Sequence, residues 1–240
     1  MEEISISKQV QERVSKIEPG TIFGLLNFSD LGHSQAVSLE LSRLNKKGTI
    51  ERLMKGKYFT LKSSRFGKLR PSESQILDCL IKENGGYFGG AIALNRAGVT
   101  TQVPSQITIR GARSTRKLKI GNIEVQFLHQ GNFAANSSLS NITDIIESIR
   151  LIKRTPDGNP KETLTRVSTL LKRVSAQDLE NLITLLRNER PYVRAILGAL
   201  LEEIGVAKAQ EIKATLNPIT RYKIGISQSQ LSNKEMWGIV

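Results

Sequence analysis

The hydrophobic pattern of the first sixty residues changes its period at Gly48, and this change restricts the possible folds more than any other feature. Before Gly48 the apolar residues recur at helical spacing, and after it they alternate as in strands. Pro19 and Gly20 end one helix, and Gly32 makes a turn. The sequence therefore predicts a helix, a short strand, a brief helix, a third helix and a hairpin, at residues 5–17, 21–23, 27–31, 34–47 and 49–61.

The turns and helix ends of this segment have specific chemistry. We expect Asn27 or Ser29 to cap the brief helix, and Gly48 to end the third helix in the left-handed conformation. Lys55-Gly56-Lys57 should form the hairpin turn, with two cations at its tip. The apolar positions predict a shared core of Val10, Val14, Phe28, Val37, Leu41 and Leu44.

Positive charge is concentrated on the last two of these elements. The chain has a net charge of +13. Residues 41–70 carry +9 of it, because they contain ten cations and a single acid, Glu51. Cations on a third helix and on the following hairpin are what a winged helix-turn-helix presents to DNA. A small α/β domain of another kind could share the element order, but it would have no reason to place cations on both. We therefore predict that residues 1–62 are a winged helix-turn-helix DNA-binding domain.

The helical periodicity separates the two sides of the third helix. Successive residues lie 100° apart, so the outer face is centred opposite Val37. Short polar side chains near the start of such a helix can hydrogen-bond to base edges, and cations can contact phosphates. The alternative is that these residues form an ordinary solvent-exposed helix face or turn. The candidate DNA-binding residues are Ser34, Gln35, Ser38, Leu39, Ser42, Arg43, Lys46 and Lys47 on the helix, and Arg52, Lys55 and Lys57 on the hairpin.

The rest of the chain predicts a second, larger region. Residues 63–71 are expected to be a basic linker, residues 72–133 to form helices and a small antiparallel sheet with strands at 105–111, 115–121 and 123–129, and residues 134–240 to be helical. The overall class is thus α+β. Five helices are expected at 141–153, 160–173, 176–188, 191–204 and 206–216.

A second basic patch is a candidate on the predicted sheet. Its cations could bind nucleic acid or an acidic protein surface, or they could be the solvated side of a half-buried sheet. The patch comprises Arg110, Arg113, Arg116, Lys117 and Lys119.

Catalytic and metal-binding readings find little support. Cys79, His33 and His129 are too few for a disulfide framework or an ordinary zinc site, and the histidines lack catalytic partners at motif spacing. The glycine-rich GGYFGG at 85–90 lacks the remainder of a phosphate-binding loop and is expected to be a turn. We therefore expect a binding protein without cofactor or metal. No apolar run is long enough to span a bilayer, and a cytoplasmic location is expected.

Several segments together resemble the AbiEi-type antitoxins of type IV toxin-antitoxin systems, in the version with a DUF6088-like architecture. They are EPGTIF (18–23), LSRLNKKGTIERLMKGKYF (41–59), ALNRAGVTTQVP (93–104), RKLKIGNIEVQF (116–127) and LNPITRYKIGI (216–226). The resemblance implies an N-terminal winged helix joined to a C-terminal antitoxin domain. It also implies an autorepressor that binds inverted repeats at its own promoter and counteracts a nucleotidyltransferase-like toxin, without requiring a stable complex with it.

Two other functions stay open at this point. One is a stand-alone transcription repressor with an effector or oligomerisation domain. The other is a nucleic-acid-processing enzyme fused to a DNA-binding head, against which the missing catalytic constellation argues. Whether the protein binds DNA as a dimer is likewise open.

Overall fold

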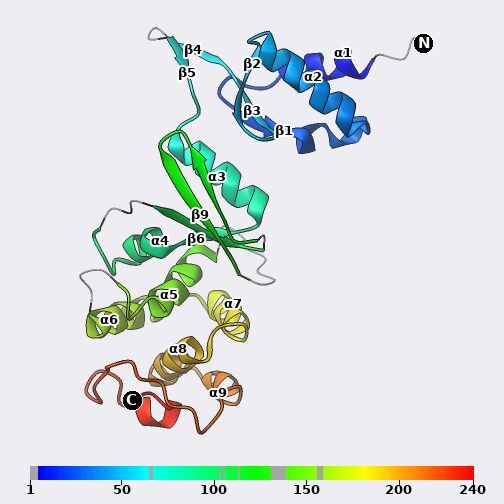
Figure 1. Cartoon of the computed structure of the whole chain (residues 1–240). Helices are drawn as coiled ribbons and strands as arrows, with labels where there is room; N and C mark the ends of the chain where they lie inside the picture. Colours follow the sequence, from blue (N-terminus) through cyan, green and yellow to red (C-terminus); the bar gives the residue numbers. More distant parts are fainter. Residues whose placement is uncertain are drawn as a thin grey trace. The chain divides into compact units, whose positions relative to one another are not determined.

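The computed structural model describes residues 5–64, 67–102, 104, 106–112, 114–130, 139–155 and 159–240. The chain divides into two compact units, Met1–Lys82 and Glu83–Val240 (Figure 1). Both units contain helices and strands, so the expected α+β class is confirmed. The second domain was expected to start at residue 72. The second compact unit starts at Glu83, near the end of the helix Glu73–Asn84.

The first unit begins with the expected order of elements. Its three-stranded sheet has the order β1-β3-β2, with both pairs antiparallel. A second strand pair, β4 with β5, lies in the stretch that was expected to be a linker. The elements are α1 (Ile6–Ser15), β1 (Ile22–Gly24), the 3₁₀ segment η1 (Leu25–Leu31), α2 (Ser34–Lys46), β2 (Ile50–Met54), β3 (Lys57–Thr60), β4 (Lys62–Ser64), β5 (Gly67–Leu69) and α3 (Glu73–Asn84).

One hydrophobic cluster holds α1, η1, α2 and the sheet together. All six residues predicted for this core are buried in it, and the strands add Phe23, Ile50 and Tyr58. The cap expected for the brief helix is wrong, because η1 already begins at Leu25, before both Asn27 and Ser29. The Asn27 side chain nevertheless stabilises this start, since its Oδ1 accepts a hydrogen bond from the Gly24 N–H at 2.9 Å.

The second unit combines a four-stranded sheet with a helical region. Helix α4 packs against strands β6 and β7, and α5 packs against α4 and β6. The elements are β6 (Tyr87–Gly89), α4 (Gly90–Ala97), β7 (Ile107–Gly111), β8 (Arg116–Ile120), β9 (Ile123–His129), α5 (Ser140–Arg150), α6 (Pro160–Leu171), α7 (Ala176–Leu186), α8 (Pro191–Glu203), α9 (Ala209–Lys213) and η3 (Lys234–Trp237).

The sheet corrects two sequence-based expectations. It is mixed rather than antiparallel, because β9 pairs with β7 in parallel and with β8 in antiparallel register, in the order β6-β7-β9-β8. The GGYFGG segment is not merely a turn, since Tyr87–Gly89 forms the edge strand β6. The central position of β9 suits its buried Val125 and Phe127, whereas β8, with exposed lysines, lies at the other edge.

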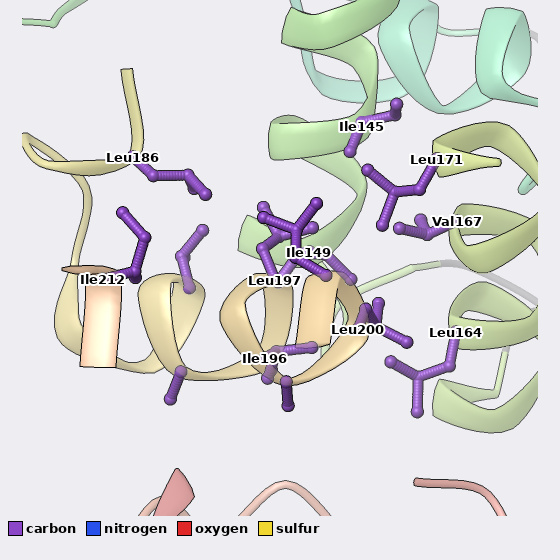
Figure 2. Close-up of a cluster of buried hydrophobic side chains, with 14 of the residues drawn as sticks. Ile145, Ile149, Leu164, Val167, Leu171, Leu186, Ile196, Leu197, Leu200 and Ile212 are labelled. Carbon is purple, nitrogen blue, oxygen red and sulfur yellow. The ribbon is translucent and has the colours of Figure 1, made fainter. Parts of the chain in front are cut away.

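Helices α5 to α9 surround one continuous apolar core (Figure 2). Ile149 of α5, Leu164 and Val167 of α6 and Leu197 of α8 are all buried in it. The helices end within a few residues of the predicted boundaries, although α9 is shorter than expected.

The expectation of a helical region up to residue 240 fails beyond α9. The last segment is mostly irregular and contains only the short η3 and a parallel bridge between Tyr222 and Ile239. It is nonetheless part of the core, because Trp237 packs so closely on Gly198 that a Cβ there would lie 2.2 Å from the indole ring. None of the helices in the described part of the chain is both long and apolar enough to cross a membrane.

A buried ion network joins the sheet to the helices. The carboxylate of Glu147 in α5 is fully buried and accepts hydrogen bonds from Arg110 at 2.8 Å, from Arg150 at 2.6 Å and from the Gly90 N–H at 2.9 Å. Arg150 also pairs with Glu189. Burial by itself raises the pKa of Glu147, but the two guanidinium groups and the N–H outweigh it and hold the pKa below its usual value.

We predict that Glu147→Gln destabilises the protein strongly, because it leaves the guanidinium groups of Arg110 and Arg150 without their shared counter-charge. Breaking a buried pair in this way typically costs about 3–5 kcal/mol. Urea unfolding of both proteins at neutral pH measures the difference.

The matched control is Glu180→Gln, which removes the partner of Lys208 from an exposed pair. Exposed pairs contribute about 1 kcal/mol or less, so this variant should unfold close to the unmodified protein. Equal losses in the two variants would show that the Glu147 network does not hold the second unit together.

Candidate nucleic-acid interface

Helix α2 presents the polar face that the sequence predicts. It begins after Gly32, whose φ of +77° makes the turn, and it ends at Gly48, whose φ of +72° matches the expected left-handed cap. Val37, Leu41 and Leu44 are buried against α1 and η1. Of the candidate residues on this helix, Ser42 is half-buried and the others are exposed: Ser34, Gln35, Ser38, Leu39, Arg43, Lys46 and Lys47.

Leu39 and His33 are two residues of this region whose side chains have no partner among the described residues that would explain their position. Leu39 is apolar, yet 54% of its surface is exposed to solvent on the outer face. His33 is the residue before the first turn of α2, but its side chain makes no capping hydrogen bond there. The exposed face of α2 thus combines short polar groups, cations and one uncovered leucine.

Glu40 is a buried acid on the inner side of α2 that the sequence-based analysis did not single out. Its Oε1 accepts a hydrogen bond from the Gln11 side chain of α1 at 2.6 Å, and Arg43 lies 3.5 Å from Oε2. The hydrogen bond from Gln11, with help from Ser7 and Arg43, keeps the pKa of Glu40 below its usual value. Helical spacing places Glu40 on the core side, but its partner lies 29 residues earlier in the chain.

An exposed ion pair fixes η1 against α1. The Arg13 guanidinium donates to both carboxylate oxygens of Asp30, at 2.5 and 2.7 Å, and to the Asn27 carbonyl at 3.1 Å. The same group lies 5.7 Å from the centre of the Phe28 ring. Helix α2 packs on both α1 and η1, so these contacts help to fix the position of α2 and of its exposed polar face.

The β2–β3 turn is the second part of the candidate interface. Its Gly56 has a φ of +75°, and the pairing slips by one residue between Arg52 and Met54. Arg52 and Lys55 are exposed, whereas Lys57 is half-buried beside Gly24 of β1. A Cβ at Gly24 would lie 2.6 Å from the Gly56 carbonyl, so a glycine is required for this close approach.

These cations are mostly not neutralised within the protein. Lys46, Lys47 and Lys55 have no ion pair with any described residue, and Arg43 makes only the long contact with Glu40. The structure thus keeps unpaired positive charge on both α2 and the β2–β3 turn, which suits an anionic partner.

The second basic patch of the sequence does not form one surface. Arg110 turns inward to Glu147, and Arg116 lies over the Phe127 ring at 4.0 Å and donates to Asn84 at 2.8 Å. Lys117 and Lys119 are exposed on the edge strand β8, as expected for the solvated side of a sheet. Arg113 lies outside the described residues.

The sequence also contains possible metal ligands and a single thiol. Within the described ranges, no group of three or more His, Cys, Asp or Glu side chains is arranged to hold a metal ion. Cys79 is half-buried, and burial raises the pKa of its thiol, which makes it less reactive.

A family model, described as a family of unknown function (DUF6088), matches residues 9–179 of the chain. The protein belongs to the DUF6088 family. This match covers most of the first unit as well as the sheet and the first helices of the second. The family description states no activity and leaves the role of both units open.

Comparison with other proteins adds little about the role of this DUF6088 protein. A solved structure, the crystal structure of the RV2827C protein from Mycobacterium tuberculosis, is similar to it with a TM-score of 0.46 and 14% sequence identity. The similarity covers 92% of this chain and 85% of that one. None of the curated proteins matches significantly.

We predict that Glu40→Gln destabilises the protein at neutral pH and that this loss disappears in acid. The folded-state pKa of Glu40 is lowered, so its ionised form stabilises the fold above the unfolded pKa of about 4.3. That stabilisation is lost as the pH falls through the folded value.

Urea unfolding of the protein and the variant at several pH values between 3 and 7 measures this difference. Glu12→Gln is the control, because Glu12 is an exposed residue of α1. A difference between the protein and Glu40→Gln that does not change with pH would assign the effect of the substitution to packing rather than to charge.

Proposed function

We propose that the first unit is a winged helix-turn-helix that binds double-stranded DNA. The observation that carries the proposal is that α2 is buried on one side by α1 and η1 while its other side exposes serines, a glutamine and cations. A helix that lies in the major groove needs such a face. The β2–β3 turn, with Lys55 exposed and Gly56 allowing close approach, suits the sugar-phosphate backbone.

The proposal gives the side chains different roles. Gln35 and Ser38, near the start of α2, would read base edges, and the exposed Leu39 would cover a thymine methyl group. The cations would contact phosphates and set the position of the protein on the duplex without reading its sequence. They are Arg43, Lys46 and Lys47 on α2, and Arg52, Lys55 and Lys57 on the hairpin.

For the whole chain we propose an antitoxin that represses its own promoter by binding inverted repeats there. This part of the proposal is supported by the resemblance to AbiEi-type antitoxins. In that family DNA binding and antitoxicity are assigned to separate domains. The division of the chain into two compact units, each with its own core, is compatible with such a separation. The alternative is a stand-alone repressor whose second unit binds an effector or mediates oligomerisation.

We predict that the protein binds its own upstream DNA with a steep salt dependence, because each phosphate contact releases counterions and adds about −0.9 to the log-log slope. Lys55→Ala with Lys57→Ala should weaken binding to all duplexes alike and reduce the slope by about 2. Gln35→Ala should instead cost roughly 1–3 kcal/mol at one base pair and leave binding to unrelated DNA unchanged. Gel-shift titrations over a salt series measure all three quantities.

The charge-matched control is Lys161→Ala with Lys172→Ala, since both lysines are exposed in the second unit. Binding that does not depend on salt, or equal losses in the control and in the hairpin variant, would disprove a specific role for the hairpin. Equal loss of specific and unrelated binding in Gln35→Ala would show that α2 does not read bases.

We further predict that repression and antitoxicity can be separated in the full-length protein. The variant with Lys55→Ala and Lys57→Ala should lose repression of a reporter placed behind the upstream region. It should still rescue cells that express the product of the neighbouring gene, because the second unit is unchanged. Failure of the intact chain to rescue growth, or loss of rescue together with repression, would contradict the antitoxin assignment and favour the stand-alone repressor.

A further inference from the structure

The second unit contains a cleft of about 920 Å³ with a strongly cationic lining. Its wall is formed by the ends of β7 and β9, the turn after α5, the start of α8 and the C-terminal segment around Tyr222. Among the described residues that line it, Glu189 is the one acid. The cations are Arg110, Arg150, Lys153, Arg154, Arg190, Arg221 and Lys223.

The two innermost arginines are already neutralised. Arg110 and Arg150 share the buried carboxylate of Glu147, and Arg150 also pairs with Glu189. The Arg150 carbonyl in turn accepts a hydrogen bond from the Tyr192 hydroxyl at 2.8 Å. These contacts hold the floor of the cleft in place, and the charge available to a ligand must come from elsewhere.

The outer cations have no such partners. Lys153, Arg154, Arg190 and Lys223 are all exposed, and none forms an ion pair with a described residue. Among the described residues, Arg221 donates hydrogen bonds only to the backbone carbonyls of Pro218 and Thr220, at 2.8 and 3.3 Å, and no carboxylate neutralises it there. Five cations that converge from three distant segments on one concavity concentrate a positive potential there.

The start of helix α8 is a further feature of the wall that suits an anion. Helix α8 begins at the cleft with Pro191, has no acidic residue in its first turn and has no side-chain cap. The acid nearest to this helix start in the sequence, Glu189, is engaged by Arg150.

We propose that this cleft binds a small ligand with several phosphates, of the class of nucleoside di- and triphosphates. Lysine and arginine side chains and a helix N-terminus are the groups that bind phosphate chains. The volume lies in the range of small-molecule sites, and Leu128, Tyr192 and Ile224 add apolar surface that a base and sugar would cover. This inference does not depend on the proposed function of the first unit.

The test is isothermal titration of the full-length protein with ATP, GTP, inorganic tripolyphosphate, adenosine and a short DNA duplex. We expect both nucleotides to bind more tightly than tripolyphosphate, and adenosine not to bind. Arg154→Ala with Lys223→Ala should weaken nucleotide binding about tenfold or more, because two hydrogen bonds to charged groups are lost. Lys161→Ala with Lys172→Ala removes the same charge outside the cleft and should leave the affinity unchanged.

The other outcomes separate the alternatives. Tripolyphosphate binding as tightly as the nucleotides would keep the phosphate site but remove the base from the proposal. Absence of nucleotide binding at millimolar concentration would overturn it, as would equal losses in the cleft and control variants. Loss of duplex binding in the cleft variant, with no nucleotide binding to the intact protein, would reassign the cleft to nucleic acid. Circular dichroism of each variant establishes that it is folded.

Discussion

The buried carboxylate of Glu147 is the interaction on which the second unit depends most. A charge without solvent is tolerated only when it is paired and hydrogen-bonded, and Glu147 meets this condition with Arg110 of β7, Arg150 of α5 and the first N–H of α4. The three partners come from three elements, one of which is α5 itself. Arg150 extends the network to Glu189, at the connection between α7 and α8. The relative positions of sheet and helices are therefore fixed by directional contacts as well as by the apolar core.

A second pair on the same helix shows how burial and pairing oppose each other. Asp144 accepts two hydrogen bonds from Arg96 of α4, at 2.7 and 2.9 Å, yet burial raises its pKa to about 6. Glu147 lies deeper but has two guanidinium partners, and its pKa is lowered. The number of cations around each carboxylate, rather than its depth, decides whether its pKa is raised or lowered.

Much of the first unit could be predicted from the sequence because its determinants are local. Val37, Leu41 and Leu44 repeat at helical spacing, and Gly48 and Gly56 adopt the positive φ values that their turns require. Local rules could not supply the partner of Glu40, because Gln11 belongs to another helix. They also placed the start of η1 wrongly, since a side chain that suits a cap, as in Asn27, can serve equally well from inside the first turn.

The second unit was harder to predict because its determinants are distant in the sequence. Strands β7, β8 and β9 were found from their alternating residues, but alternation does not indicate which strands pair or in which direction. The last segment has no helical period, and its place depends on Trp237 fitting against Gly198. A fit of this kind between two residues far apart in the chain leaves no periodic signal in either segment.

The same difference between local and distant determinants explains where positive charge was found and where it was missed. The cations of α2 and the β2–β3 turn are close in sequence, so a count along the chain detects them. Lys153, Arg190 and Lys223 are far apart, and acids are interspersed with the cations between them, so that residues 153–223 carry +5 where residues 41–70 carry +9. In the folded unit several of those acids are paired elsewhere: Glu189 pairs with Arg150, Glu211 with Arg187 and Glu180 with Lys208. A region whose charges are mixed along the sequence can thus contain a cleft of high local positive charge, because folding brings unpaired cations together and places several acids in other pairs.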